Sequence, residues 1–309
     1  MERESRIYIA GHKGLVGSAL MRMLSGRGYR NVIVKRRDEL DLRCQLSVRS
    51  FFEKERPDYV FLAAAKVGGI WANDSYPADF IYDNVMIQSN VIHEAYRANV
   101  KKLLFLGSSC IYPRDCPQPI KERYLLSGPL EKTNEAYAVA KICGIRMCQS
   151  YRKQYGCNYI SGMPTNLYGP NDNFDLKSAH VIPALIRKFY EGKVQNKPSV
   201  EIWGSGNPRR EFLYVDDLAE ASLFLMEQYN ESEIINIGTN KDASIIEIAG
   251  IIKECIGYKG AIVCNPAMPD GTPQKLLDVT RINALGWAAK TLLQDGIRNT
   301  VKWYTEEQK

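Results

Sequence analysis

Short apolar runs alternate with longer amphipathic segments through the first half of the chain. Runs that are short and continuously apolar are typical of strands buried on both faces of a sheet. The predicted strands are Arg6–Ile9, Asn31–Lys35, Tyr59–Ala65, Leu103–Leu106 and Tyr159–Met163. The first predicted helix begins near Leu15. The next three cover Gln45–Arg56, Phe80–Ala98 and Asn134–Tyr155. Strands and helices that alternate in this way indicate a doubly wound parallel sheet.

The pattern is less regular in the second half. The predicted helices are Ser178–Glu191, Asp216–Met226, Ser244–Ile256 and a last one near Leu292–Tyr304. The predicted strands are Val200–Trp203, Glu211–Val215 and Ile234–Gly238. We therefore predict an α/β fold with a Rossmann-type doubly wound parallel sheet and a smaller C-terminal α/β substrate lobe. Residues 1–165 and roughly 205–240 would form the nucleotide-binding domain, and roughly 166–204 and 241–309 the lobe.

The composition narrows the class of protein. With 309 residues, 45% hydrophobic and 25% charged, the chain is typical of soluble globular proteins. Its net charge of +6 is too mild and too evenly spread for nucleic-acid binding but suits an anionic small molecule. We expect reduced thiols and no metal site, because the eight cysteines lack zinc-binding spacing. No apolar run approaches the ~20 residues of a membrane span, and the first strand leaves no room for a signal peptide. We therefore expect a soluble cytoplasmic protein.

Three glycines follow the first predicted strand at positions 11, 14 and 17. A strand, a glycine-rich turn and a helix form the setting in which such glycines bind a pyrophosphate. Gly11 and Gly14 would allow a tight turn and close backbone approach, Gly17 would let helix and strand pack, and the helix N-terminus would face the negative charge. The alternative is a set of ordinary turn glycines. The position directly after the first strand favours dinucleotide binding.

Basic side chains follow the second predicted strand, in Arg36-Arg37-Asp38. An NAD site needs a carboxylate near this strand end for the ribose 2′-hydroxyl, whereas cations suit a 2′-phosphate. Lys13 and Arg37 would converge on that phosphate, so we favour NADP over NAD. The alternative is a solvated basic loop. Asp41 and Leu42 follow, where an adenine ring would rest.

The chemistry is concentrated between Gly107 and Lys141. Ser108 follows a buried strand, and ligands of open α/β sheets bind at the carboxyl ends of strands. Tyr137 and Lys141 are four residues apart, on one face of a helix. A nearby ammonium would lower the pKa of a tyrosine and suit it to proton transfer, while the serine hydroxyl binds the same carbonyl oxygen. The YxxxK pattern is common by chance, and it gains meaning only from its position after the glycine turn and Ser108.

These features, in this order, resemble the extended short-chain dehydrogenase/reductase superfamily. The stretches GHKGLVGSA, GSSCIYP, MPTNLYGPNDNF, HVIPALIRKF, WGSGNPRREFLYVDDLA and PDGTPQKLLDVTR are similar, within it, to the GDP-L-fucose synthase family. The resemblance covers essentially the whole chain. It implies contacts with NADP(H) from Gly11, His12, Lys13, Gly14, Leu15, Val16, Gly17, Arg37, Asp41, Leu42, Ala63, Ala64, Ala65, Leu106, Gly107, Tyr137, Lys141, Pro164, Thr165, Asn166, Leu167 and His180.

The resemblance also implies catalytic and substrate-binding roles. The catalytic set would be Ser108, Cys110, Tyr137, Lys141 and His180. The substrate contacts would be Ser108, Ser109, Cys110, Asn166, Lys188, Trp203, Arg210 and Asp270. Taken singly, Cys110 would be a core thiol and His180 a histidine on a helix face. Which of the two is acid or base at each carbon stays open, as does the choice between Arg209 and Arg210.

Lysine stands at positions 13 and 188, where we expect arginine as often. Lysine keeps the charge but lacks the bidentate fork of arginine.

The implied reaction is NADPH-dependent epimerisation at carbons 3 and 5 and reduction of the 4-keto group of GDP-4-keto-6-deoxy-D-mannose, which gives GDP-L-fucose. Epimerisation beside a ketone needs an acid and a base on different sides of the sugar, with the ketone oxygen stabilised. The alternatives are a reductase, or an epimerase/reductase for a related GDP-deoxysugar or GDP-heptose, and a non-catalytic NADP-binding protein. We expect a homodimer formed through the helix that bears Tyr137.

Overall fold

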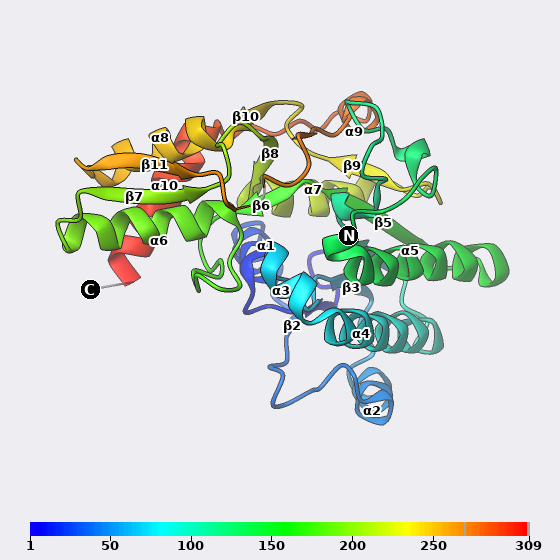
Figure 1. The fold of residues 1–309 in the computed structure, drawn as a ribbon. Coiled ribbons are helices and arrows are strands. Elements are labelled where there is room, and N and C mark those ends of the chain that lie inside the picture. Colours follow the sequence, from blue (N-terminus) through cyan, green and yellow to red (C-terminus); the bar gives the residue numbers. More distant parts are fainter. Residues whose placement is uncertain (269, 308–309) are drawn as a thin grey trace.

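The computed structural model describes residues 1–268 and 270–307. Six parallel strands form its central sheet, in the spatial order β2-β1-β3-β4-β5-β9 (Figure 1). Their bounds are β1 (Ile7–Ala10), β2 (Val32–Ile33), β3 (Tyr59–Leu62), β4 (Lys102–Leu106), β5 (Tyr159–Pro164) and β9 (Ile235–Ile237). The chain goes from β1 to β2 on one side and then to β3 on the other. This reversal places a crevice between the carboxyl ends of β1 and β3, where open α/β sheets bind ligands.

Helices cover both faces of the sheet, which confirms the predicted Rossmann-type fold. The helices α1 (Leu15–Gly26) and α7 (Val215–Gln228) pack together on one face. The helices α2 (Gln45–Glu55), α4 (Pro77–Arg97) and α5 (Glu135–Tyr155) form the other layer (Figure 1). All residues of β1 and β4 are buried, as the apolar runs Ile7–Ala10 and Leu103–Leu106 require, and the buried Lys102 ammonium donates to main-chain carbonyls of α7.

A second, smaller group of elements packs around its own apolar cluster, which includes Ile186, Phe189 and Ile252. It comprises α6 (Val181–Val194), β7 (Ser199–Trp203), α8 (Ile245–Ile256), β11 (Ala261–Asn265) and α10 (Leu293–Glu307) (Figure 1). The start of α8 is fixed by a capping box, because Ser244 accepts from the Glu247 N–H while the Glu247 carboxylate accepts from the Ser244 N–H.

The strand β8 (Arg209–Tyr214) joins the two groups. It pairs with β6 (Asn166–Tyr168), β10 (Asp242–Ser244) and β12 (Gln274–Lys275). Leu277 and Trp287, which we expected in the C-terminal lobe, are buried in the apolar core that surrounds the central sheet. The division into two domains stays a proposal, and in it these two residues pack with the nucleotide-binding domain.

Several short elements were not predicted from the sequence. They are α3 (Ile70–Ser75), α9 (Thr280–Ala284), the strands β6, β10, β11 and β12, and single 3₁₀ turns at Ser109–Ile111, Glu122–Tyr124 and Lys132–Asn134. The helix predicted from Ser178 begins at Val181, so His180 precedes it as its N-cap. Within the described residues, no helix has the length and apolar character that crossing a membrane requires.

Candidate active site

One cavity of about 1420 Å³ runs from the carboxyl ends of the sheet strands to the smaller group of elements. The glycine turn lines one part of it and Trp203 another. Its volume exceeds the ~300–1,000 Å³ that suffices for a single small ligand. The cavity therefore has room for a dinucleotide and a second nucleotide at the same time.

The glycine turn forms a close-packed cradle at the start of α1. Gly11 has φ +89°, a backbone conformation that favours glycine, and a Cβ there would lie 2.9 Å from the Ala64 backbone. A Cβ on Gly17 would lie 2.1 Å from the Gly11 carbonyl oxygen. Gly14 is the N-cap of α1, and no side chain caps that helix end. The first N–H groups of α1 are thus open to an anionic ligand, which fits a pyrophosphate.

The loop after β2 presents cations to the cavity. Lys35 and Arg37 line the cavity, whereas Arg36 faces away and pairs with Asp38 at 3.1 Å. Lys13 is exposed and does not line the cavity, so the expected convergence of Lys13 and Arg37 stays a prediction. Lys35 is the cation that the sequence argument missed. A basic loop of this kind suits a 2′-phosphate.

Asp41, the one acidic residue near this end that we expected to contact the cofactor, is already engaged. Its carboxylate accepts from the Arg43 guanidinium at 2.7 Å, and these hydrogen bonds lower the pKa of Asp41 to about 2. Arg43 also pairs with Asp83 at 3.0 Å. The Asp41 carboxylate is therefore charged at neutral pH and has a cation to neutralise it.

Ser108, Tyr137 and Lys141 gather at the end of β4. Ser108 is the N-cap of the turn at Ser109–Ile111, where its hydroxyl accepts from the Cys110 N–H at 3.2 Å. The Lys141 ammonium donates to the Leu106 carbonyl at 2.8 Å and lies 5.8 Å from the centroid of the Tyr137 ring. Lys141 is anchored beneath the tyrosine rather than in the cavity wall.

Burial controls the protonation of this group. It raises the pKa of Tyr137, and the Ser108 hydroxyl opposes that effect in part. Burial lowers the pKa of Lys141 to about 8. Without ligands the tyrosine is consequently a phenol at neutral pH, which is the form that donates a proton.

Cys110 and His180 reach the same cavity from different elements. Cys110 lies in the turn that follows β4, and its thiol is 4.0 Å from the Lys275 ammonium. His180 is the N-cap of α6, and its ring is accessible through the cavity. Desolvation by the surrounding walls lowers the pKa of His180. The two residues are proton-transfer groups on separate walls of one cavity.

Cations and an aromatic side chain gather at the other end. The Lys188 ammonium lies 5.7 Å from the centroid of Trp203 and donates to the Glu201 carbonyl at 3.1 Å. The Asp270 carboxylate accepts from the Ser205 N–H at 2.7 Å, which fixes the turn that follows Trp203.

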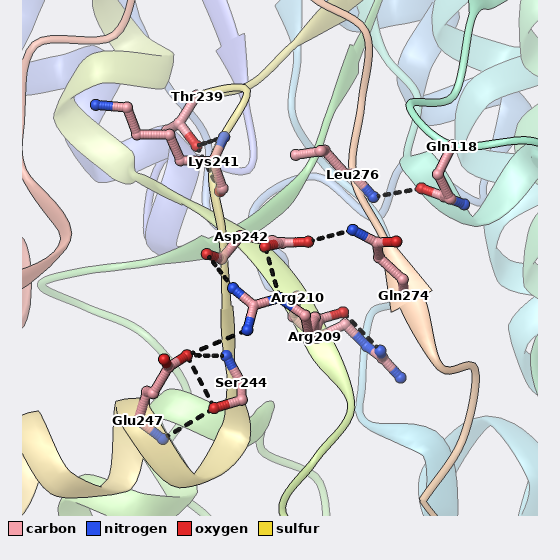
Figure 2. Close-up of polar contacts among 10 residues, drawn as sticks. All are labelled: Gln118, Arg209, Arg210, Thr239, Lys241, Asp242, Ser244, Glu247, Gln274 and Leu276. Atoms are coloured by element: carbon pink, nitrogen blue, oxygen red, sulfur yellow. Dashed lines mark hydrogen bonds and ion pairs between the residues drawn. The ribbon is translucent and has the colours of Figure 1, made fainter.

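The structure separates Arg209 from Arg210. Arg209 pairs with Asp242 at 2.8 Å and Glu247 at 3.5 Å, and its side chain points away from that of Arg210 (Figure 2). Arg210 lines the cavity, where burial lowers its pKa and Asp270 opposes that effect. Of the two arginines, only Arg210 therefore faces the cavity.

The cavity brings together most of the residues that the sequence predicted. Among the predicted site residues, those that do not line it are His12, Lys13, Leu106 and Lys141. Within the described part of the chain, no group of three or more His, Cys, Asp or Glu residues could hold a metal ion.

Three cavity residues outside that set carry buried oxygens without a hydrogen-bond partner. They are Asn73 Oδ1, Asn134 Oδ1 and Asp172 Oδ2. The orientation of the Asn73 amide is well determined, because its Nδ2 donates to the Gly68 and Gly69 carbonyls at 2.7 and 3.0 Å. Buried polar atoms are rarely left unpaired, but these oxygens are covered by their neighbours, so they are not open to a ligand in the cavity as they stand. Their spacing in the sequence gave no signal of this.

Comparisons with known proteins agree with this geometry. The profile described as the NAD dependent epimerase/dehydratase family matches residues 7–238. The chain is 56% identical over 306 residues to the putative GDP-L-fucose synthase 2 of Arabidopsis thaliana, covering 99% of this chain and 93% of the relative. It is 54% identical over 314 residues to the GDP-L-fucose synthase of Escherichia coli, covering 99% and 98%. The GDP-mannoheptose C4 reductase from Campylobacter jejuni, solved with NADP bound, has a TM-score of 0.91 at 44% identity and 99% coverage of both chains.

Proposed function

The chain belongs to the NAD dependent epimerase/dehydratase family, and from this membership we propose that it is an NADPH-dependent epimerase and reductase of a GDP-linked keto sugar. It inverts carbons 3 and 5 of GDP-4-keto-6-deoxy-D-mannose and then reduces the 4-keto group, which gives GDP-L-fucose. The observation that carries this proposal is the single cavity lined by Cys110, His180, Ser108 and Tyr137. Its support from the comparisons is the 54% and 56% identity to GDP-L-fucose synthases over nearly the whole chain.

NADP(H) fits the part of the cavity at the glycine turn. The N-terminus of α1 at Gly14 would receive the pyrophosphate, and Arg37 and Lys35 would receive the 2′-phosphate. When bound, NADPH supplies the hydride that reduces carbon 4. Ser108 and Tyr137 line the same cavity, so the hydride would be delivered beside them.

Ser108 and Tyr137 hold the ketone oxygen of the substrate. The pKa of the buried Tyr137 phenol is raised, so the phenol enters the reaction protonated and gives its proton to that oxygen as carbon 4 is reduced. Lys141 stabilises the phenolate that results, because its ammonium stays near the Tyr137 ring through its hydrogen bond to Leu106.

Cys110 and His180 carry the epimerisations. Removing a proton beside the ketone leaves an enolate, whose oxygen Ser108 and Tyr137 stabilise. Returning a proton to the opposite face needs a second group on another wall of the cavity. Cys110 and His180 come from the end of β4 and the start of α6, which suits such an arrangement.

The GDP group is assigned to the end of the cavity at Trp203. Lys188 and Arg210 offer cations to the diphosphate, Trp203 offers a ring face, and Asp270 accepts from hydroxyl groups. Trp203 has 45% of its surface exposed, so its ring face is available to a ligand.

Deuterium exchange separates epimerisation from reduction. The protein is incubated with GDP-4-keto-6-deoxy-D-mannose in deuterated water without NADPH, and deuterium at carbons 3 and 5 is read by NMR. We expect exchange at both carbons, slower in Cys110→Ser and His180→Asn, and hydride transfer to carbon 4 once NADPH is added. Tyr137→Phe is the matched variant, in which we expect the rate of NADPH oxidation to fall by a larger factor than the rate of deuterium exchange.

Two other outcomes would each reject the proposal. NADPH oxidation without exchange would identify a C4 reductase, the activity named for the Campylobacter jejuni relative. Neither exchange nor NADPH oxidation, with NADPH still bound, would identify a non-catalytic NADP-binding protein.

We further propose that the protein acts as a cytoplasmic homodimer. The helices α4 and α5 pack side by side, and α5 exposes the apolar side chain of Val139 (41%) on its surface. A second copy would cover this side chain. Sedimentation should therefore show a dimer, and Val139→Glu should shift it toward monomer; a wild-type monomer would contradict the proposal.

A further inference from the structure

Lys275 meets the catalytic thiol from a distant part of the chain. Its ammonium lies 4.0 Å from the Cys110 sulfur, although the two residues are 165 positions apart. We propose that Lys275 is a positioning residue for epimerisation, whose ammonium orients the Cys110 sulfur toward the substrate and stabilises negative charge on it. This proposal rests on the proposed function and deepens it, because it assigns Cys110 the role of base.

The backbone around Lys275 is fixed on both sides. Lys275 pairs with Arg210 in the β8–β12 ladder. The next residue, Leu276, donates its N–H to the Gln118 side chain at 2.8 Å (Figure 2) and accepts from the Ile120 N–H at 2.7 Å. Gln118 and Ile120 belong to the segment that follows Cys110. The backbone from which the Lys275 side chain projects is therefore fixed relative to the segment that follows Cys110.

Lys275 has no carboxylate partner, although the Cys116 thiol also lies within its electrostatic range. Within residues 1–268 and 270–307, no carboxylate lies within 4 Å of its ammonium, so its charge is available to a thiolate. Arg210 also lies within electrostatic range of Cys110, but it interacts with Asp270 as well and is assigned to the diphosphate. Tyr137 is the third titratable group near the thiol. Once substrate is bound, Lys275 is the remaining cation for Cys110.

The proton balance of the step is simple. The Cys110 thiolate takes the proton from the carbon beside the ketone, so that a C–H bond breaks and an S–H bond forms. The electron pair moves to the ketone oxygen, which Ser108 and Tyr137 stabilise. Desolvation disfavours the His180 imidazolium in the ligand-free cavity, but the negative charge of the enolate favours it, and its proton then forms the new C–H bond on the opposite face. An ammonium next to the sulfur favours the thiolate before this step.

Thiol reactivity tests Lys275 without using the enzyme reaction. The alkylation rate of Cys110 by iodoacetamide is measured against pH by peptide mass spectrometry, which distinguishes it from the other seven cysteines. In Lys275→Met we expect the midpoint of this profile to rise by about one pH unit or more, so that alkylation below the midpoint slows about ten-fold. Lys275→Arg should restore the profile, because it keeps the charge.

A second lysine serves as the matched control. Unlike Lys275, Lys121 approaches a carboxylate, Asp278 at 3.9 Å, and it does not line the cavity. Lys121→Met should leave both the alkylation profile and the exchange rate unchanged. Thermal unfolding of all variants shows whether each is folded. If Lys275→Met does not fold, the comparison of Lys275→Arg with the wild type still tests the proposal, because a changed alkylation profile there would contradict it.

The enzymatic arm separates positioning from substrate binding. Lys275→Met should slow deuterium exchange without NADPH at least about ten-fold while leaving the dissociation constant of GDP within about two-fold. An unchanged alkylation profile together with weaker GDP binding would overturn the proposal and make Lys275 a phosphate ligand. If the wild type shows no exchange, the proposed function fails, while the alkylation profile still decides the relation of Lys275 to Cys110.

Discussion

Replacing Gly17 by alanine tests whether the glycine turn positions the cofactor. The new Cβ would lie 2.1 Å from the Gly11 carbonyl oxygen and 2.6 Å from the Gly11 carbonyl carbon. These are backbone atoms, which cannot move aside as a side chain end can. The turn and α1 must therefore separate by at least about 1.3 Å to reach an ordinary contact distance of 3.4 Å.

This separation should lower both the stability of the fold and the affinity for NADPH. Overpacking of this kind costs about 1–3 kcal/mol of unfolding free energy. The N–H groups at the start of α1 also move away from the pyrophosphate, and a hydrogen bond to a charged group contributes about 1.5–3 kcal/mol. A loss of about 2 kcal/mol corresponds to an increase of about 30-fold in the dissociation constant of NADPH.

Gly26→Ala is the matched control in the same helix. A Cβ at Gly26 would meet no atom within 4 Å. Alanine in a helix is more favourable than glycine by about 0.5–1 kcal/mol, so this variant should be slightly more stable than the wild type. Its NADPH affinity should not change, because the substitution lies at the far end of α1 from the turn.

Urea denaturation without ligand and NADPH titration by fluorescence measure the two quantities. Wild-type affinity in Gly17→Ala would show that the turn is not the pyrophosphate site. Wild-type stability in Gly17→Ala, with Gly26→Ala stabilised, would show that α1 and the turn are not in the close contact described above. Either result refutes the reasoning.

Three further predictions concern charged groups that line the cavity or lie beneath its wall. Arg37→Ala should raise the KM for NADPH at least about ten-fold and leave the KM for NADH nearly unchanged, because only NADPH carries the 2′-phosphate; an equal effect on both would contradict the assignment. Burial lowers the pKa of Lys141 to about 8 from 10.5, so the reduction rate should fall as pH rises through about 8. The stability of the wild type relative to Lys141→Met should rise between about pH 8 and 10, because the unfolded chain binds the proton that the folded one has lost. A stability difference that does not change with pH in urea denaturation would reject this. Burial raises the pKa of Asp172 to about 7 from 3.8, so folding takes up a proton between these pH values. The wild type should therefore lose stability relative to Asp172→Asn as pH rises from about 4 to 7, which urea denaturation measures.

The regular elements were predictable because local sequence determines them. The apolar run of β4 and the helical period of α5 are buried as expected, and both elements begin and end within one or two residues of the prediction. The glycine turn was recognisable for the same reason, since its meaning depends on a strand before it and a helix after it. These local signals were sufficient to predict the fold and the part of the cavity at the glycine turn.

The short elements depend on tertiary pairing and gave no such signal. The strand β12 has two residues, Gln274 and Lys275, and exists because β8 offers it a partner. The helix α3 has six residues and exposes Ile70 and Trp71, so it has no apolar period to detect. The contact between Lys275 and Cys110 could not be predicted because it depends on these pairings. The choice of Arg210 over Arg209 likewise needed the ion pairs that Arg209 makes with β10 and α8.

The cavity is complementary to a ligand that is both anionic and rich in donors. Its cations include Lys188 and Arg210, which call for negative charge. Its acceptors include the exposed carboxylate of Asp270, which calls for hydroxyl or amide hydrogens. A simple anion would satisfy the cations but would be repelled by this carboxylate. A nucleotide-linked sugar offers both phosphates and hydroxyl groups, so the carboxylate near Arg210 is the part of the cavity that distinguishes such a ligand from phosphate alone.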